Sequence, residues 1–297
     1  MSTVTNTGTL FPHELSLDMF NQVKGHSTLA KLSGTDSVPF AGTDIFVFSM
    51  DGEASIVGEG ENKPAGEATV GTVSIKPIKV VYQHRVTNEY QKMSNEKRIP
   101  YLNAFSMGFA KKIARALDIC AIHGVNPADN VESPMIGNNC FDKKISNTVT
   151  YSNLTPDDNI DSAVGLIQTA ERDVTGLAMS ASVGADLGKM KMSDSHAPMY
   201  PEFRFGANPG NFGGMKADIN TTVSFGNSLD RAIVGDFANA FRWGYAEDIT
   251  FEVIEFGDPD GLGDLKRKNQ VCLRSEAFIG WAILDPASFA RIVATNP

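Results

Sequence analysis

The sequence has little cysteine and no long apolar run. Among its 297 residues only Cys120, Cys140 and Cys272 are cysteines, and they lie far apart without the spacing of a zinc site. Scattered thiols suit a reducing compartment better than a disulfide framework. No apolar segment approaches the ~20 residues that span a bilayer, and the start, MSTVTNTGTLFPHELS, lacks the basic and apolar regions of a signal peptide. We therefore expect a protein that is made in a cytosol and has no membrane segment.

Motifs for catalysis and for metal or cofactor binding are also missing. Residues 206–216, GANPGNFGGMK, are rich in glycine but lack the Lys-Ser/Thr pair of a phosphate-binding loop. Residues 258–264, DPDGLGD, lack the distal glutamate of a calcium loop, and no serine or cysteine occupies a nucleophile elbow. We therefore expect a structural protein with no catalytic, cofactor or metal site. The histidines, none of them in HxH or HxxxH spacing, are His13, His26, His84, His123 and His196.

Positive charge is scarce relative to negative charge. The chain has 26 lysines and arginines against 35 acidic residues, which gives a net charge of −9. This balance argues against a protein that grips phosphate backbones with a basic surface, although it leaves open a protein that encloses nucleic acid without binding it tightly. Hydrophobic residues at 42% and charged residues at 21% are typical of a folded globular chain, long enough for one large or two ordinary domains.

The clearest periodic pattern predicts a long helix over residues 94–124. Pro100 is expected in its first turn, and Gly124 is expected to end it in the left-handed conformation. A polar stripe is predicted on the solvent side, formed by Lys111, Arg115 and Asp118. The apolar face, in three- and four-residue steps, consists of Leu102, Phe105, Phe109, Ile113, Ala116 or Leu117, and Cys120.

Residues 42–86 read as a strand, an irregular polar tip and a returning strand. Pro77 cannot donate a ladder hydrogen bond, so this segment is an edge or a two-stranded ribbon. Such a ribbon is only marginally stable alone, so we expect it to project and to be held by a neighbour; a hairpin folded flat on its own domain is the alternative. Residues 1–35 are polar with a short helix near Glu14 to Lys24, and form either a tail or an arm that orders against another chain.

The rest of the chain mixes strands and helices without regular alternation or internal repeat. A helix is predicted to start at Thr155, short strands over 178–230, and mainly strand over 231–284 with a bulge at Ile254. Asp285 and Pro286 are predicted to cap a short closing helix with Phe289 and Ile292 facing inward. The expected fold class is α+β and not a doubly wound sheet.

Several segments, taken in order, resemble the major capsid proteins of tailed bacteriophages with the Hong Kong 97 fold. Residues 54–64, ASIVGEGENKP, resemble the tip of that family's extended loop, and residues 72–90 resemble its returning strand. The helix end at 114–124 has an Asp followed six residues later by Gly, and residues 187–203 contain a Tyr-Pro pair. Residues 269–292 carry an Arg-x-Glu strand before a Pro-capped segment. The order and spacing of these segments carry the resemblance.

The resemblance implies an α+β Hong Kong 97-type capsid fold. Its parts are an N-terminal arm (1–41), an extended β-ribbon loop (42–86), a peripheral domain with a long spine helix (87–125 and 246–297) and an axial domain (126–245). The arm and loop are expected to reach onto neighbouring subunits.

The function implied is that of a major head protein of the virion. Subunits self-assemble as pentamers and hexamers into an icosahedral shell that encloses double-stranded DNA without sequence-specific binding. Assembly is expected in the host bacterial cytoplasm, with separate scaffolding, portal and decoration proteins as possible partners and no membrane. An encapsulin-type nanocompartment shell around a cargo enzyme is the alternative.

Five charged residues are the candidates for subunit contacts, because identical copies need reversible charged contacts. Some family members cross-link a loop lysine to an asparagine of another subunit. Lys63 is a candidate for that lysine, but no matching Asn–Glu pair can be assigned here, so no cross-link is expected. The chain starts at Met1 with a short arm, so a separate scaffold or none is expected. The candidates are Glu59, Glu61 and Lys63 on the loop tip and Arg274 and Glu276 on the late strand.

Overall fold

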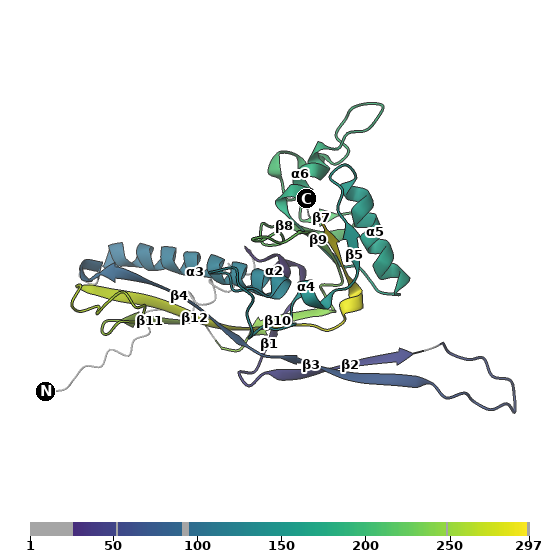
Figure 1. Ribbon diagram of the computed structural model, residues 1–297, viewed down its shortest axis with the longest axis horizontal. Helices are drawn as coiled ribbons and strands as arrows, with labels where there is room; N and C mark the ends of the chain where they lie inside the picture. The colour runs from purple at the N-terminus through teal and green to yellow at the C-terminus, as the bar shows by residue number, and fades with distance from the viewer. Residues whose placement is uncertain (1–25, 52, 91–94, 248, 296–297) are drawn as a thin grey trace.

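The computed structural model describes residues 26–295 apart from residues 52, 91–94 and 248. The helix expected near Glu14 to Lys24 lies outside the described residues. Figure 1 shows an elongated part in which a long helix lies along a sheet, an upright part around a second sheet, and a hairpin projecting below. We call the first part the helix–sheet body and the second the six-stranded body. None of the described helices has the length and hydrophobicity needed to cross a membrane.

The sheet of the helix–sheet body is organised around its longest strand, β12. One side of β12 pairs antiparallel with β4 over ten residues, from Gln270↔Thr87 to Ile279↔Ile78. The other side pairs antiparallel with β11 and then with β10, and β1 adds to β10 in parallel. The β11–β12 register is continuous up to Ile254, where β11 ends, so the predicted bulge is a strand end. The strands are β1 (Thr35–Ser37), β4 (Ile78–Thr87), β10 (Phe241–Tyr245), β11 (Thr250–Ile254) and β12 (Gln270–Ile283).

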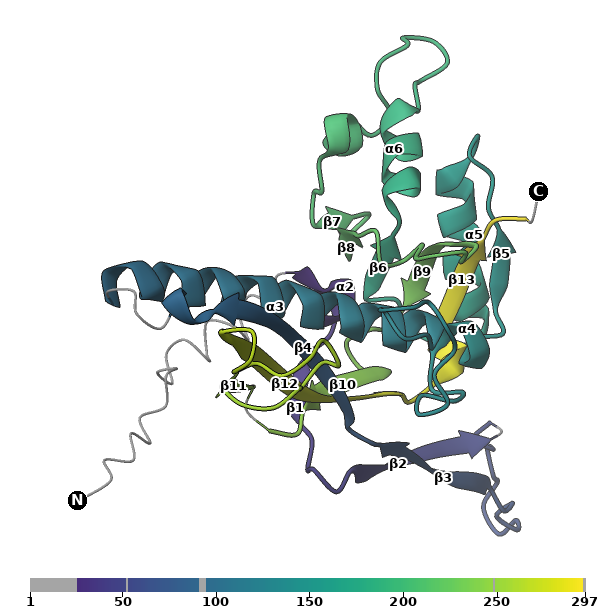
Figure 2. The same cartoon turned by 60° about the vertical axis from the view of Figure 1, so that its left-hand side comes forward.

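Helix α3 (Asn95–His123) covers one face of this sheet, close to the predicted span of 94–124 (Figures 1 and 2). Because the helix begins at Asn95, Pro100 lies beyond the first turn and not within it as expected. Gly124 ends the helix at φ +70°, and its N–H bonds to the carbonyl of Cys120 at 3.0 Å. A Cβ at position 124 would also meet the sulfur of Cys140 at 2.8 Å, so both conformation and space require glycine. The described part of the predicted apolar face is buried, namely Phe105, Phe109, Ile113, Ala116, Leu117 and Cys120.

The polar stripe predicted on α3 is wrong at one position. Lys111 is exposed and Arg115 is half-buried, but Asp118 is completely buried. The reason is a second layer over the helix that periodicity cannot reveal, because the short helix α2 (Thr28–Leu32) packs there from 90 residues earlier in the chain.

The projecting hairpin is a two-stranded ribbon of β2 (Thr43–Asp51) and β3 (Glu67–Ile75), as the sequence predicts. Its base is anchored where Ile75 is buried with Val38 and Ala282. After Pro77 the chain leaves the ribbon, and β4 pairs with β12. Residues 78–86, which the sequence analysis assigned to the extended loop, are therefore hydrogen-bonded into the five-stranded sheet.

The six-stranded body consists of a mixed sheet in the order β5-β13-β9-β6-β8-β7, with α5 and α6 beside it. Helix α5 (Pro156–Thr169) starts where predicted and buries Ile160, Ala163 and Ile167. Helix α6 (Ala181–Lys189) lies in a range for which only short strands were expected. The short helix α4 (Phe141–Lys144) lies below this body. The strands are β5 (Thr148–Thr150), β6 (Gly176–Met179), β7 (Asn211–Phe212), β8 (Met215–Ile219), β9 (Asp230–Gly235) and β13 (Phe289–Val293).

The closing segment is a strand and not the predicted helix. Asp285 accepts hydrogen bonds from Ala287 N (3.1 Å) and Ser288 Oγ (2.9 Å), but the turn that it caps is only Pro286–Ser288. Strand β13 follows, paired with β9 and β5. Phe289 packs into one core, whereas Ala290 and Ile292 pack into another on the opposite face. A strand that is buried on both faces lacks the alternation of apolar and polar residues that identifies a strand. The spacing of its apolar residues was therefore interpreted as that of a helix.

Candidate subunit-contact surfaces

The tip of the ribbon carries three of the predicted contact residues on its exposed surface. Glu59, Glu61 and Lys63 are all exposed. Glu61 Oε2 accepts a hydrogen bond from Gly58 N at 3.2 Å and so stabilises the turn of its own tip. Among the described residues, Glu59 and Lys63 have no side-chain partner, so both are available to another chain.

Arg274 and Glu276 lie on the face of β12 that points away from α3, as the alternation predicts. Arg274 Nε donates to Gln83 Oε1 at 2.9 Å, and its Nη1 lies 4.0 Å from Glu252 Oε2. Glu276 Oε2 lies 2.7 Å from Lys79 Nζ. Both residues thus take part in a cross-strand ladder of charges within one chain, and the structure does not bring them together with the ribbon tip.

The most conspicuous surface was not among the predicted residues: it is an apolar face of the ribbon. Phe46, Phe48 and Val70 are 75%, 56% and 64% exposed. The register places Phe48 opposite Val70 and Phe46 opposite Thr72, so these side chains share one face. On the other face, Ile45 and Val73 pack against the anchored base. An exposed aromatic patch of this kind marks a site of association, and the sequence signal was the unbroken apolar run from Ile45 to Phe48.

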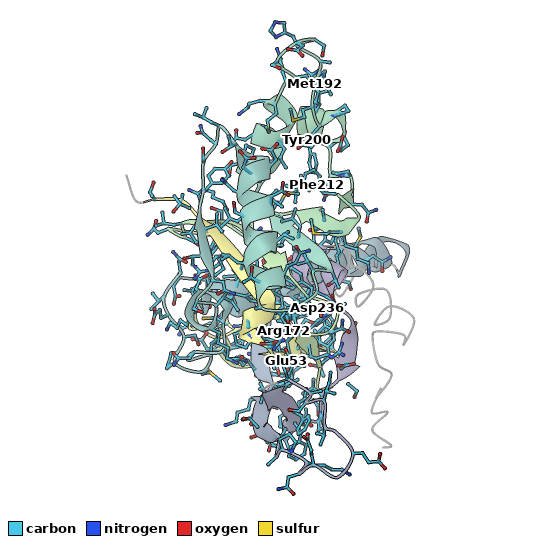
Figure 3. The ribbon with its side chains drawn as sticks, turned by 90° about the vertical axis from the view of Figure 1, so that its right-hand side faces the viewer. Glu53, Arg172, Met192, Tyr200, Phe212 and Asp236 are labelled. Carbon is cyan, nitrogen blue, oxygen red and sulfur yellow. The ribbon has the colours of Figure 1, made fainter. Side chains whose placement is uncertain are left out.

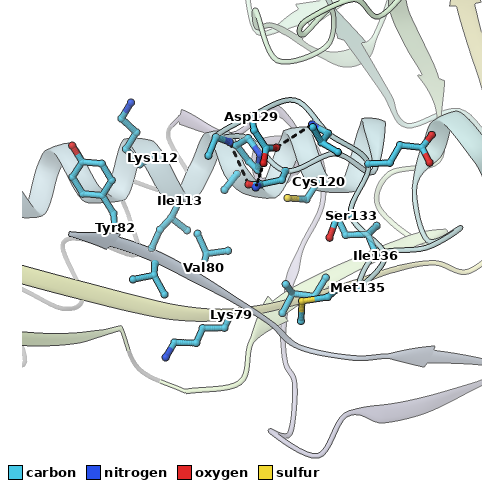
Figure 4. Close-up of a pocket in the computed structure, with 18 of the residues that line it drawn as sticks. Lys79, Val80, Tyr82, Lys112, Ile113, Cys120, Asp129, Ser133, Met135 and Ile136 are labelled. Atoms are coloured by element: carbon cyan, nitrogen blue, oxygen red, sulfur yellow. Dashed lines mark hydrogen bonds between the residues drawn. The ribbon is translucent and has the colours of Figure 1, made fainter. Parts of the chain in front are cut away.

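A groove of about 590 Å³ lies between α3, β4 and the loop 126–136 (Figure 4). Val80, Ile113 and Met135 line it, and Met135 is exposed. Asp129 holds the loop by accepting from Asn126 Nδ2 at 3.1 Å and from Val131 N at 3.0 Å. Burial raises the pKa of Cys120, another lining residue, to about 12. The lining is mainly apolar with charged side chains among it, and the thiol of Cys120 is protonated at neutral pH and therefore a poor nucleophile.

A second hollow of about 900 Å³ lies on the six-stranded body, beside α5. Tyr200 and Phe212 line it, with ring centroids 5.4 Å apart (Figure 3). The hydroxyl of Tyr200 donates to Asp157 Oδ2 at 3.0 Å. Burial and this hydrogen bond raise the pKa of Tyr200 to about 12, so the phenol is not a base at neutral pH.

A buried carboxylate connects the two bodies through α2. Asp118 of α3 accepts hydrogen bonds from the backbone N–H groups of Thr28 (3.0 Å) and Leu29 (3.2 Å) and from the hydroxyls of Ser27 and Thr222. Burial raises the pKa of Asp118, and these four donors oppose the rise.

The other end of the connection is Asp218 on β8, which is also buried. It accepts from Thr28 Oγ1 at 2.6 Å, and its other oxygen lies 2.6 Å from Lys31 Nζ. Helix α2 is thus hydrogen-bonded to α3 of one body and to β8 of the other.

A second polar cluster, which we call the ionic quartet, lies where α3 ends and consists of His123, Asp142, Asp230 and Arg291. The nitrogen Nδ1 of His123 is 3.0 Å from Asp142 and 3.7 Å from Asp230, and Nη2 of Arg291 lies 3.0 Å and 2.8 Å from the same two carboxylates. Because the guanidinium already supplies the positive charge between the carboxylates, the cluster does not fit a metal ion. Sequence reasoning missed the quartet because its members are far apart in the chain.

The family comparison and the structure comparison both find similarity to proteins of bacteriophages. A model of the phage capsid family matches residues 7–294. A chain in a solved structure of Mycobacterium phage Ogopogo is 29% identical, with a TM-score of 0.79 over 91% of this chain and 92% of that chain. A chain of Gordonia phage Cozz is 25% identical, with a TM-score of 0.76 over 92% of this chain and 87% of that one.

A more distant likeness extends over the whole chain. The capsid of a native GTA particle is 16% identical, with a TM-score of 0.64 over 100% of this chain and 95% of that chain. At that identity the likeness concerns the fold alone. No curated protein sequence matches the chain.

Proposed function

The chain belongs to the phage capsid family, and on that premise we propose how its described surfaces build a shell. It is a major capsid protein, a structural component of the virion capsid and not an enzyme. The phage-type shell is favoured over the encapsulin-type alternative, since the family model and the similar chains are those of phages.

Our proposal is that subunits assemble as pentamers and hexamers into an icosahedral shell around double-stranded DNA, in the host bacterial cytoplasm. The proposed parts of the subunit are the arm 1–41, the extended loop, a peripheral domain built on the helix–sheet body and an axial domain built on the six-stranded body. Relative to the expected bounds of 42–86 for the loop, 87–125 with 246–297 for the peripheral domain and 126–245 for the axial domain, β4 and β10 fall in the helix–sheet body and β13 in the six-stranded body. The ribbon proper is the portion of the loop up to Ile75. Scaffolding, portal and decoration proteins are proposed as separate partners.

The observation that carries the proposal is the apolar face of the ribbon. Phe46, Phe48 and Val70 lie on a two-stranded element that the described part of its own chain leaves exposed. Burying one such side chain in a neighbouring copy stabilises a contact by about 1.5–3 kcal/mol. We propose that the ribbon docks on a different part of the neighbouring copy. Such a head-to-tail contact closes into a ring when the rotation between successive copies completes a full turn.

Charged residues at the ribbon tip are proposed to adjust this contact. Glu59 and Lys63 have no partner among the described residues, so they can pair with a neighbour at no cost to their own subunit. Arg274 and Glu276 already have partners in their own chain, and a neighbour must share or displace those partners. We therefore rank the tip residues above the two strand residues as contacts. Exposed pairs contribute little each, which suits reversible assembly.

The direct test is electron microscopy of the purified protein, with absorbance at 260 and 280 nm on the same fraction. We expect uniform icosahedral particles, and a nucleic-acid spectrum in particles taken from infected cells. Because the net charge of −9 favours containment over binding, we also expect added salt to leave DNA retention in closed shells unchanged. Monomers or small oligomers under every salt and scaffold condition would refute the proposal. Shells filled with an enzyme and free of DNA would favour the encapsulin alternative.

A further inference from the structure

The ionic quartet joins elements of both bodies. His123 is the last residue of α3, in the helix–sheet body. Asp230 is the first residue of β9, and Arg291 lies in β13, both in the six-stranded body. Asp142 lies in α4. A change in the charge of any member therefore acts on the contact between the two bodies.

The hydrogen bonds of His123 define its protonation state. Its Nε2 lies 3.0 Å from the backbone carbonyl of Thr222, which can only accept a hydrogen bond. Its Nδ1 lies 3.0 Å from Asp142, which also faces Arg291 and is therefore ionised. Both ring nitrogens must donate, and only the doubly protonated imidazolium has two donors. In this state two cations, His123 and Arg291, face the two carboxyl groups of Asp142 and Asp230.

His123 and Asp230 both have raised pKa values, so rising pH affects the quartet in one direction. Burial lowers the pKa of His123, but the hydrogen bond to Asp142 and the adjacent carboxylates raise it by more, so the pKa lies above its ordinary value. Burial and the Asp142 carboxylate raise the pKa of Asp230. A group whose pKa is higher in the folded than in the unfolded state stabilises the fold fully at pH values below its unfolded-state pKa. This stabilisation is lost as pH rises through its folded-state pKa. Both groups therefore weaken the contact with rising pH.

Asp142 has the opposite dependence. Burial raises its pKa, but hydrogen bonds with His123 and Asp230 lower it by more. Asp142 therefore stabilises the fold at pH values above its unfolded-state pKa. This stabilisation is lost only when pH falls through its lowered folded-state pKa, far below the pH at which His123 loses its proton.

The remaining groups near His123 do not obscure this titration. Burial raises the pKa of the Cys140 thiol, which stays neutral. Lys143 is directed to Glu132 at 2.9 Å, and Lys144 to Asn139 at 3.2 Å. Asp118 faces the other side of Thr222, whose hydroxyl donates to it at 2.8 Å.

An apolar contact beside the quartet does not titrate. Phe141, Phe237 and Phe289 form an aromatic cluster, with ring centroids 5.0 Å apart for Phe141 and Phe289 and 5.2 Å for Phe237 and Phe289. This cluster is expected to hold the bodies together when the charges of the quartet change. Titration then loosens the contact and does not separate the bodies.

We propose that the ionic quartet is a pH-sensitive connection between the helix–sheet body and the six-stranded body. With His123 as imidazolium it holds the end of α3 against the carbonyl of Thr222 and the carboxylate of Asp142. As pH rises, His123 and Asp230 lose their protons. One ring nitrogen of His123 then has no proton to donate to its acceptor, and the carboxylates of Asp142 and Asp230 face Arg291 as the one remaining cation of the quartet. The two bodies then gain freedom to change their relative orientation. This inference concerns the single chain and stands apart from shell formation.

The test is hydrogen exchange of the full-length chain, kept unassembled, between pH 6 and pH 9 and corrected for intrinsic exchange rates. We expect protection of α4 and of residues 222–230 to fall about tenfold or more across this range, while protection of α5 stays constant. His123→Gln should show low protection at every pH and no such transition. His196→Asn, a change at an exposed histidine in a turn, should behave as the wild type. Constant wild-type protection, or the same transition in His123→Gln, would overturn the proposal.

A second measurement does not depend on a variant that may fold poorly. The ring Cε1–H resonance of His123 in the wild-type chain, followed by NMR, should titrate above the ordinary histidine range near 6.5, and the amides of residues 222–230 should shift with the same midpoint. A midpoint at or below 6.5, or amides that do not follow it, would overturn the proposal. Because neither measurement uses shells, failure of this inference is distinguishable from failure of the proposed function.

Discussion

The contact between the two bodies buries polar groups, whereas the ribbon exposes apolar ones. Around Asp118 the chain buries a carboxyl group and supplies four hydrogen-bond donors to it, from Ser27 and α2 and from Thr222. On the ribbon it exposes Phe46 and Phe48 and leaves them uncovered. The first region is complete within one chain. The second is complete only when another molecule covers it, which is the property expected of an assembling subunit.

The two regions should therefore respond to mutation in different assays. A change around Asp118 should lower the stability of the isolated subunit, and assembly should suffer only as a consequence. A change on the ribbon should leave the isolated subunit intact and impair assembly directly. A variant that lowered subunit stability and shell assembly equally would not distinguish the two regions.

The largest expected effect is that of Asp118→Ala. The substitution leaves the buried N–H groups of Thr28 and Leu29 and two hydroxyls without an acceptor, and each unsatisfied buried group costs about 1–3 kcal/mol. Because the site can relax and admit water, we expect a total loss of about 3–5 kcal/mol in the free energy of unfolding, measured by denaturant titration. Lys111→Ala, an exposed change on the same helix, is the control and should leave the midpoint unchanged. An Asp118→Ala loss below about 1 kcal/mol would show that α2 is not held by this carboxylate.

The next effect concerns assembly. The double variant Phe46→Ser with Phe48→Ser should keep the wild-type melting temperature, since both rings are exposed in the subunit. The yield of shells in sedimentation should fall at least tenfold, because every ribbon contact loses the burial of two aromatic side chains. Thr72→Ala, on the same ribbon face opposite Phe46, is the matched control and should assemble normally. Full shell yield from the double variant would show that the apolar ribbon face is not needed for the contact between subunits.

A smaller effect is expected at the turn before β13. Asp285→Ala removes the acceptor for Ala287 N and Ser288 Oγ and the partner that lies 2.6 Å from Arg172 Nε. Loss of a cap of this type costs about 1 kcal/mol. Thermal unfolding should show it, and shell yield below the melting transition should not change. If shell yield falls while the melting temperature is unchanged, this turn belongs to the assembly surface and not to the core.

The smallest effect is expected at the ribbon tip. Lys63→Gln removes an exposed charge that has no partner among the described residues, so the melting temperature should stay the same. The salt dependence of assembly should become slightly weaker, because exposed pairs are screened by ions. Lys189→Gln, whose pair with Asp186 lies within α6, is the control. Identical salt dependence in both variants would exclude Lys63 from the contact.

Local periodicity predicted those parts of the fold that depend on neighbours in the sequence. Helix α3 followed from three- and four-residue apolar steps, α5 from the cap and proline at Thr155 and Pro156, and the ribbon from strands around a glycine-rich tip. The family resemblance came from the order of several such segments. Each of these signals lies within about thirty residues, a range over which side-chain direction follows from helix or strand geometry.

The failures share a long-range cause. Asp118 appeared solvent-facing because the segment that covers it, α2, lies 90 residues away in the chain. Strand β13 resembled a helix because both its faces are covered by distant elements. The ionic quartet and the apolar ribbon face escaped prediction for a related reason. The first needs four segments to converge. The second is visible only when it is known that no described residue covers Phe46 and Phe48.

The most direct test of the account is a reconstruction of the assembled shell at a resolution that shows side chains. The account predicts that the ribbon of each subunit lies on a neighbouring copy, with Phe46, Phe48 and Val70 buried against it and Asp118 in the same hydrogen bonds as in the single chain. Ribbons that project into solvent with these three side chains exposed, in an otherwise closed shell, would contradict it.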